Sequence, residues 1–248
     1  MSANNNLFKK SLDILKANNI NYWVCHGTLL GIIRNKNLLD WDHDIDFAVW
    51  EDEHSKEEII KLFSNDQEYT QEISLEEINS LHFATLGKRI DINFYTRDNN
   101  KAYIKWAVPS EGKSKIFNQF KRLYHFILFF LVNNLRIKDA IKSSKTTTSK
   151  VIKFFTILPL TMIRKILSNK IKRKLLKLVY KEFDILGYSF PLNLMEFEEM
   201  VFNGIKIRIP KNPEEVLEFT YGKDWKIPKK NYVWYKEAKN LYRLEKNN

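Results

Sequence analysis

The chain has 248 residues, of which 44% are hydrophobic and 29% charged, and its formal net charge is +11. That apolar share is enough to build a buried core, which excludes a wholly disordered chain. The single cysteine, Cys25, excludes an internal disulfide framework and any site that needs several cysteines to hold zinc or an iron–sulfur cluster.

The positive charge is concentrated in one central segment. Residues 113–181 carry eighteen Lys and Arg against one acid, a charge of +17, and the rest of the chain carries twenty-three bases and twenty-nine acids, a charge of −6. The segment also contains two apolar runs, 123–132 and 154–163, each about half as long as the roughly 20 residues that a membrane-spanning helix needs. We therefore expect a helical insert with cationic faces.

This insert leaves two interpretations open. A solvated helical subdomain would use its lysines for solubility, whereas an anionic membrane surface would attract them at about 1 kcal/mol each. The insert lacks a recognisable nucleic-acid-binding motif, so we expect no nucleic-acid partner. The N-terminus is polar and shows no signal peptide, which predicts a cytoplasmic protein that is peripheral at the inner face of the membrane if the insert binds lipid.

Periodicity and turn residues predict alternating helices and strands before the insert. The expected elements are a helix over 7–18, a strand over 20–25, a turn at 26–28, a helix over 29–34, a strand over 44–50, a helix over 55–63 and a strand over 89–95. Ser55 is the expected N-cap of the third helix, because Glu58 follows three residues later as in a capping box.

After the insert, Asn203-Gly204 predicts a hairpin turn within 201–210. A helix is expected over 213–221, because Pro213 suits its first turn and Gly222 its end. The expected fold class is therefore α/β (α+β), a mixed sheet flanked by helices, with a basic and mostly helical insert. The expected domains are a catalytic core over 1–112, the insert over 113–181, and a C-terminal part over 182–248 that packs back on the core.

Acids occupy every second position in Trp41-Asp-His-Asp-Ile-Asp46. A strand places alternate residues on one face, so Asp42, Asp44 and Asp46 would point the same way if the strand begins that early. Carboxylates this close repel one another unless a cation neutralises them, and Mg²⁺ prefers oxygen ligands. The pattern is that of a phosphoryl-transfer site with bound metal ions.

Asp91 is the natural third ligand, because it lies between Ile90 and Ile92 in a predicted strand. A carboxylate in such a strand is costly unless it is paired or bound to a metal. Taken alone, Asp91 is better interpreted as a surface residue of a half-exposed strand. Beside the first group of acids, we favour a metal ligand.

A possible phosphate-binding turn precedes the acidic strand. Gly27 permits a close approach of the backbone, Thr28 offers a hydroxyl group near a helix start, and Arg34 could clamp a phosphate. A glycine and a threonine before a helix are also an ordinary cap. The combination with Asp44 and Asp46 about sixteen residues later is more specific.

Together these residues resemble the nucleotidyltransferase-fold superfamily and, more narrowly, the LicD and fukutin-related phosphotransferase family. The resemblance is carried by Gly27-Thr-Leu-Leu-Gly31, Arg34, Trp41-Asp-His-Asp-Ile-Asp46, Asp91, Pro210-Lys-Asn-Pro213 and Tyr221-Gly-Lys-Asp-Trp225. The chain departs from the pattern at His26, where many members have glycine, and at His43, where many have aspartate.

The resemblance implies a nucleotidyltransferase-like core and the transfer of a phospho-alcohol, such as phosphocholine or a polyol phosphate, from a CDP-linked donor. The implied acceptor is a cell-surface glycan, as in capsule or lipopolysaccharide modification, or its polyprenyl-diphosphate-linked precursor. By position, Asp44, Asp46 and Asp91 would be catalytic and would hold Mg²⁺, or Mn²⁺ in its place. Gly27, Thr28 and Arg34 would face the phosphates of the donor, with Asp42 as an auxiliary acid.

Two other functions remain open from the sequence. One is a nucleotidyltransferase that moves a nucleoside monophosphate from an NTP to a protein, an RNA or a small molecule. The other is a membrane adaptor without enzymatic activity that works through the basic insert. The acidic pattern argues against the adaptor.

Overall fold

The computed structural model describes residues 3–72, 79–109, 124, 127–128, 130–132, 159–180, 183–229 and 232–243. The chain divides into two units. The first comprises Met1–Gln71, Ile78–Trp106 and Ile185–Asn248, and the second comprises Glu72–Glu77 and Ala107–Asp184. The predicted acidic residues all belong to the first unit.

The first unit opens with helix α1, Ala3–Ala17, and strand β1, Tyr22–Val24, as predicted. Helix α2, His26–Leu30, and the π-helical turn η1, Gly31–Asn35, follow directly. The prediction of a turn at 26–28 is therefore wrong. The amide of Leu29 bonds the carbonyl of Cys25 at 3.0 Å, so the helical hydrogen bonds begin as soon as β1 ends.

Five elements follow, of which the helix and two of the strands agree closely with the prediction. They are β2, Asp44–Trp50; α3, Lys56–Ser64; β3, Thr70–Gln71; β4, Ser80–Ala84; and β5, Arg89–Asp98. The Ser55 hydroxyl accepts a hydrogen bond of 3.1 Å from the amide of Glu58, which confirms the N-cap. The sequence did not reveal β3 and β4.

Beyond β5 the chain forms strand β6, Lys101–Pro109, and, after the insert, β7, Phe183–Pro191, and a 3-10 turn η2, Leu192–Met195. The rest comprises β8, Phe197–Phe202; β9, Ile205–Pro210; α8, Pro213–Tyr221; η3, Lys223–Lys226; α9, Trp234–Glu237; and β10, Leu241–Arg243. The hairpin turn and the helix are confirmed. Asn203 and Gly204 both have positive φ, 49° and 78°, as a two-residue hairpin turn requires.

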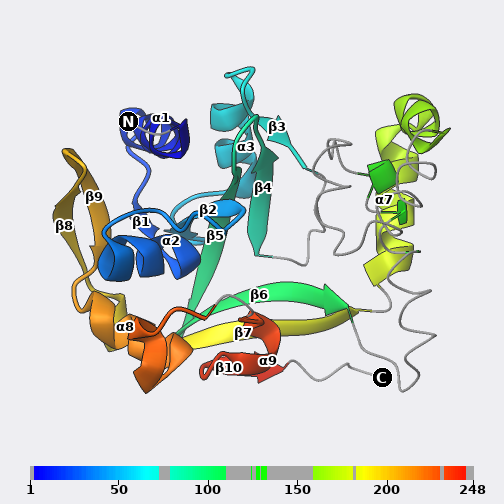
Figure 1. The fold of residues 1–248 in the computed structure, drawn as a ribbon. Helices are drawn as coiled ribbons and strands as arrows, with labels where there is room; N and C mark the ends of the chain where they lie inside the picture. The colour runs from blue at the N-terminus through cyan, green and yellow to red at the C-terminus, as the bar shows by residue number, and fades with distance from the viewer. Residues whose placement is uncertain are drawn as a thin grey trace. The chain divides into compact units, whose positions relative to one another are not determined.

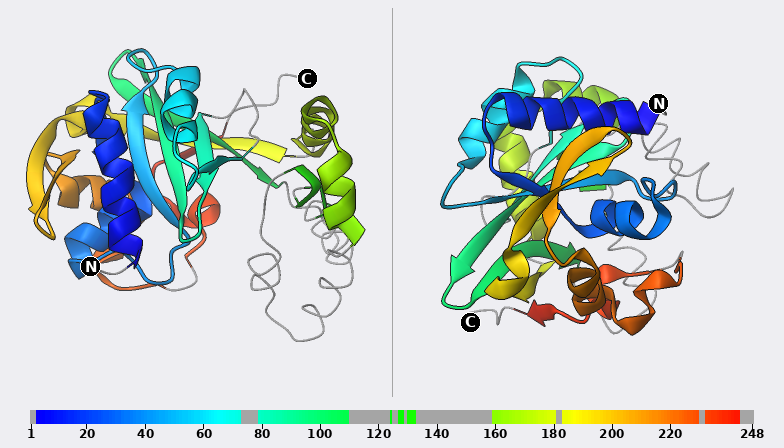
Figure 2. Two further views of the ribbon diagram at one scale, coloured as in Figure 1. Left: turned by 90° about the horizontal axis from the view of Figure 1, so that it is seen from above. Right: turned by 90° about the vertical axis from the view of Figure 1, so that its left-hand side faces the viewer.

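The larger sheet has the order β1-β2-β5-β6-β7-β10, with β4 also paired to β5 and β3 to β4 (Figure 1). β2 and β5 run parallel, whereas β1 is antiparallel to β2 and β4 is antiparallel to β5. The sheet is therefore mixed and helices flank it, which confirms the predicted class. β8 and β9 form a separate two-stranded sheet that lies beside α1 (Figure 2), where the rings of Phe8 and Phe202 are 5.9 Å apart.

The two faces of the β2–β5 region differ in character. Alternation puts Phe47 and Phe83 on one face, where Phe8 of α1 stacks on Phe47 at 5.5 Å and Phe63 of α3 stacks on Phe83 at 4.7 Å. These rings are fully buried and anchor the strands in the core. The polar residues of the same strands point to the opposite face, at the start of α2.

The second unit is described only in part. It contains helical residues at 124, 127–128 and 130–132, a helical segment at 159–166, and helix α7, Asn169–Tyr180. Most of the predicted insert lies outside the described residues. Within the described part of the chain, no helix has the length and apolar character that crossing a bilayer requires.

Candidate functional site

The register of β2 and β5 brings the predicted carboxylates together. Asp46 lies directly opposite Asp91 across the two parallel strands, and Asp44 lies opposite Arg89. Since residues two apart in a strand share a face, all four side chains emerge from the same face of the sheet. The three acids that the sequence singled out as metal ligands therefore form one group.

Arg89 lies within this group and contacts two of the acids. Its Nε donates to Oδ1 of Asp91 and its Nη2 to Oδ2 of Asp91, both at 2.6 Å. The same Nη2 donates to Oδ2 of Asp44 at 3.1 Å. A bidentate pair between guanidinium and carboxylate is among the stronger polar contacts in proteins, so Arg89 partly neutralises the acids.

His82 approaches the group from the other side, on β4. It pairs in register with Asp91, and its Nδ1 lies 3.0 Å from Oδ1 of Asp91. The Nε2 atom of His82 is 3.2 Å from the hydroxyl of Ser80. Asp91 is thus held between two basic side chains on two strands.

These neighbours give the three acids different proton affinities. Burial, followed by the charges of Asp91 and Asp42, raises the pKa of Asp44 well above its usual range. Burial, followed by the charges of Asp44 and Asp91, does the same to the pKa of Asp46. Burial also acts to raise the pKa of Asp91, but Arg89 and His82 outweigh it and hold that pKa well below its usual range.

Two polar side chains fix the position of Asp46. The hydroxyl of Thr28, in α2, accepts a hydrogen bond of 2.8 Å from the backbone amide of Asp46. The amide of Asn93 donates to the carbonyl of Phe47 at 3.3 Å and lies 3.5 Å from Oδ1 of Asp46. Thr28, predicted to face the donor, therefore also joins α2 to the acidic strand.

Asp42 reaches the site from the turn before β2, because the strand begins only at Asp44. Its carboxylate occupies the space beside Gly27, so that a Cβ atom on Gly27 would collide with Oδ2 of Asp42. The ammonium group of the buried Lys88 donates to the backbone carbonyls of Leu39 and Asp42 and holds this turn in place. Gly27 and Asp42 are thus adjacent to each other and to Asp46.

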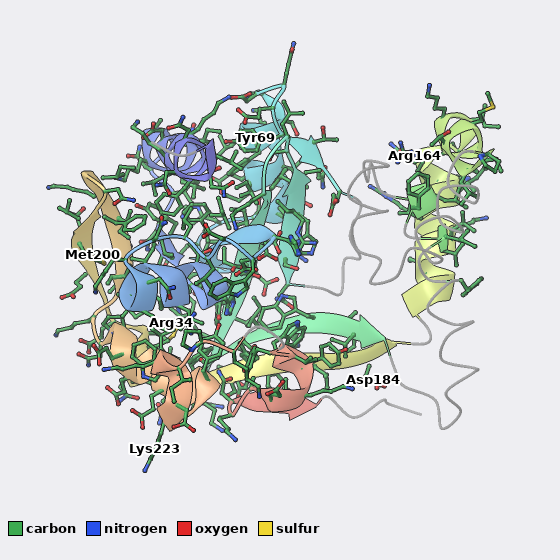
Figure 3. The ribbon with its side chains drawn as sticks, viewed as in Figure 1. Arg34, Tyr69, Arg164, Asp184, Met200 and Lys223 are labelled. Atoms are coloured by element: carbon green, nitrogen blue, oxygen red, sulfur yellow. The ribbon has the colours of Figure 1, made fainter. Side chains whose placement is uncertain are left out.

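Arg34 lies farther along the same segment, in η1, where it faces the C-terminal part of the chain (Figure 3). Its Nη1 donates to the carbonyl of Trp225 at 3.2 Å and its Nε to Oδ1 of Asn35 at 2.7 Å. No contact described for Arg34 reaches the carboxylates. The bond to Trp225 does join the two predicted motifs, which are far apart in the sequence.

The sequence itself indicates an ion pair between Arg89 and Asp91, which lie two positions apart, and the structure confirms that pair. The sequence does not indicate His82 and Asn93 as members of the site. His82 depends on the pairing of β4 with β5, and Asn93 on the pairing of β5 with β2, which short-range patterns do not specify.

The three carboxylates are suited to a hard divalent cation, although Arg89 already neutralises part of their negative charge. As arranged here, no three acidic, His or Cys side chains of the described residues surround a common point as metal ligands. Burial and the neighbouring carboxylates nevertheless raise the pKa of Asp44 and of Asp46, so a nearby positive charge would favour their ionised forms. A cation such as Mg²⁺, which prefers carboxylate oxygens, would supply it.

One protein-family model matches more than half of the chain. Residues 19–164 match the family model described as LicD/FKTN/FKRP, nucleotidyltransferase domain. That range includes all seven predicted site residues, namely Gly27, Thr28, Arg34, Asp42, Asp44, Asp46 and Asp91.

Two similar curated proteins are uncharacterized proteins of Rickettsia prowazekii (strain Madrid E) and Rickettsia typhi (strain ATCC VR-144 / Wilmington). Each is 38% identical to the chain over 58 residues, which is 23% of this chain and 22% and 19% of theirs. The chain thus matches about a fifth of the length of these relatives.

A solved structure of the antibiotic-resistance factor ANT(2'')-Ia covers 70% of this chain and 89% of that one, at 11% identity and a TM-score of 0.33. A score this low does not establish a shared fold. The family match rests instead on residues 19–164. The chain belongs to the LicD/FKTN/FKRP nucleotidyltransferase-domain family.

Proposed function

We propose that the protein is a Mg²⁺-dependent phosphotransferase. It moves a phospho-alcohol, such as phosphocholine or a polyol phosphate, from a CDP-linked donor to a cell-surface glycan or its lipid-linked precursor. The observation that carries the proposal is the pairing of Asp46 with Asp91 across parallel strands, with Asp44 on the same face. Family membership supports the phosphotransferase class, and the choice of donor and acceptor is ours.

Asp44, Asp46 and Asp91 are the proposed ligands of Mg²⁺, which Mn²⁺ could replace. Bound there, the cation would neutralise charge on the phosphate oxygens in the transition state. For the cation to take three carboxylates, Arg89 has to give up part of its contact with Asp44 and Asp91. Its guanidinium then remains next to the transferred phosphate as a second positive charge.

The neighbouring residues would bind and position the donor. Gly27 has no side chain, and this lets the carboxylate of Asp42 lie beside Asp46. Thr28 keeps Asp46 at a fixed distance from α2. We propose that Arg34 contributes a guanidinium to the donor phosphates, supported by its anchor to Trp225.

In the proposed reaction, a hydroxyl oxygen of the acceptor forms a bond to the β-phosphorus of the donor. The bond from that phosphorus to the CMP oxygen breaks, and CMP leaves. The hydroxyl proton passes to a carboxylate of the site. Catalysis of this kind depends on positioning and on charge neutralisation, and both require the rigid strand pair described above.

The test is to incubate the full chain with Mg²⁺ and either CDP-choline or a CDP-polyol and to measure CMP by chromatography. We expect CMP release with one of these donors, and loss of at least 99% of it in Asp46→Asn, about the 10²-fold that loss of one charge-stabilising group costs. Asp52→Asn is the matched control, because Asp52 is an exposed acid in the turn after β2. Equal activity in both variants would contradict the site assignment.

The alternative reaction uses the same carboxylates with a different donor. Release of pyrophosphate from an NTP, with no CMP from any CDP-alcohol, would show nucleotidyl transfer and would replace the proposed function. The assay therefore includes ATP, CTP, GTP and UTP under the same conditions.

A further inference from the structure

The helical segment 159–166 of the second unit presents an apolar face that the described residues leave uncovered. Met162 is 76% exposed, Ile166 is 82% exposed and Ile163 is 42% exposed. At about 100° per residue, these three positions fall within an arc of about 100° on the helix surface, so the three side chains form one stripe. Isolated apolar side chains on a surface need no explanation, but a stripe of three on one helix does.

The opposite side of the same segment is already occupied. Arg164 (labelled in Figure 3) places its guanidinium over the ring of Phe130 at 4.8 Å, and Phe130 is fully buried. Arg164 and Ile166 project about 160° apart on a helix with 100° per residue, so Ile166 points away from Phe130.

Helix α7 continues from this segment with a second, basic face. The hydroxyl of Ser168 accepts from the amide of Ile171 at 3.4 Å, and the carbonyl of Ser168 accepts from the amide of Lys172 at 3.0 Å, so α7 starts directly after the first segment ends. Leu175 packs against Leu128 on the inner side of α7. The exposed bases of α7 are Lys170, Arg173, Lys174 and Lys177.

The charge of these two helices has one sign. Residues 159–180 contain seven Lys and Arg and no acid. A second copy of the same surface would bring like charges together, which disfavours self-association. A nucleic acid would account for the bases but leaves the exposed Met162, Ile163 and Ile166 without a role. A bilayer with anionic lipids accounts for both features, since an interfacial helix buries apolar side chains while its bases contact headgroups.

We propose that residues 159–180 form a docking surface for an anionic lipid bilayer. Met162, Ile163 and Ile166 enter the boundary between headgroups and acyl chains, and Lys170, Arg173 and Lys177 contact the lipid phosphates. This inference goes beyond the proposed function, and it stands whichever donor the site uses. It would hold the protein at the surface where a lipid-linked acceptor is found.

The test measures co-sedimentation of the full chain with vesicles of equal parts phosphatidylcholine and phosphatidylglycerol, and with vesicles of phosphatidylcholine alone. We expect binding to the first and little to the second. Lys170→Gln, Arg173→Gln and Lys177→Gln together should weaken binding by about a hundredfold, from about 1 kcal/mol for each base. The matched control removes three exposed bases of the first unit with Lys61→Gln, Lys101→Gln and Lys223→Gln, and should change binding much less.

A second variant tests the apolar stripe. Met162→Gln with Ile166→Gln should weaken binding about tenfold or more and should leave the melting temperature unchanged, because both side chains are exposed. Unchanged vesicle binding in both variants would overturn the proposal. A fall in molecular mass caused by Met162→Gln with Ile166→Gln, without an effect on vesicle binding, would instead identify a contact between copies and would also overturn it.

Discussion

Arg89 binds Asp91 through two parallel hydrogen bonds of 2.6 Å, although the two residues lie only two positions apart on the same strand. The strand places both side chains on one face, and the long arginine turns back over the shorter aspartate. Its Nη2 also reaches Asp44 at 3.1 Å. The carboxylates that we propose to bind Mg²⁺ thus already contact one positive charge, the guanidinium of Arg89.

This relationship predicts how Arg89→Gln responds to magnesium. Without a divalent cation, the variant should be less stable than the wild type by about 1–2 kcal/mol, because the buried carboxylates lose their positively charged partner. The expected loss is smaller than for a fully buried ion pair, because the Arg89 side chain is 40% exposed. With Mg²⁺ present the difference should shrink, because the cation takes over the neutralising charge. Melting temperatures in EDTA and in Mg²⁺ measure both quantities.

Arg97→Gln is the matched control for that experiment. Arg97 lies on the same strand β5, is 38% exposed at its side chain, and pairs with Glu53 and Asp52 away from the site. Its loss should lower the melting temperature by an amount that does not depend on Mg²⁺. The same dependence on Mg²⁺ in both variants would refute the role assigned to Arg89.

Asp46→Asn should stabilise the metal-free protein while it removes activity. Burial and the charges of Asp44 and Asp91 raise the pKa of Asp46 in the folded state, so the ionised carboxylate destabilises the fold at neutral pH. The loss of stability begins as the pH rises above the ordinary pKa of an aspartate, because the unfolded chain then ionises Asp46 more readily than the folded chain does. Asparagine has no charge and avoids this loss. We expect a gain of about 1 kcal/mol in the free energy of unfolding at pH 7 in EDTA, measured by urea titration. A loss of stability in EDTA would contradict this explanation.

His26 predicts a separate dependence on pH. Burial lowers the pKa of His26 from 6.5 to about 4. The unfolded chain therefore binds a proton between these values that the folded chain does not, and the contribution of His26 to stability is present above pH 6.5 and lost as the pH falls toward 4. His26→Asn removes the titration, and asparagine tolerates the positive φ of 48° at this position.

The measurement for His26 is the free energy of unfolding of both proteins at pH 7 and pH 5. The wild type should lose about 2 kcal/mol more than His26→Asn over this interval. Parallel curves for the two proteins would show that His26 titrates normally in the folded state.

Two glycines near the site should respond differently to alanine. A Cβ atom at Gly27 meets the end of the flexible side chain of Asp42, whereas a Cβ atom at Gly31 would lie 2.7 Å from the backbone oxygen of Asn37. Gly27→Ala should therefore lower activity with a change of less than about 1 kcal/mol in stability, because Asp42 can swing away. Gly31→Ala should lower the melting temperature clearly, because backbone has to move. The reverse order would show that Asp42 is fixed more rigidly than its contacts indicate.

The parts of the fold that the sequence predicted depend on local interactions. The cap at Ser55 needs only the amide three residues later, and the turn at Asn203-Gly204 needs only two residues that accept positive φ. The alternation from Asp44 to Trp50 likewise follows from one buried face of a single strand. Asp91 was placed with the acids because its own strand shows the same alternation.

The parts that the sequence did not predict depend on pairing between distant strands. His82 enters the site only because β4 pairs with β5 in the register that sets it opposite Asp91. The sequence predicts a turn at His26, because Gly27 and Thr28 resemble a helix cap. In the structure, the hydrogen bond from the amide of Leu29 to the carbonyl of Cys25 already closes a helical turn there. The hydrogen bond from Arg34 to Trp225 joins residues that are far apart in the sequence, so no short-range pattern predicts it.

The most direct test of the central claim is the melting temperature of the full chain with CDP-choline or a CDP-polyol, with and without Mg²⁺. A ligand that binds only the folded state raises the melting temperature. We predict a rise that requires both the CDP-alcohol and Mg²⁺ and that disappears in Asp46→Asn but persists in Asp52→Asn. A rise with NTPs alone, or one that survives in Asp46→Asn, would contradict it.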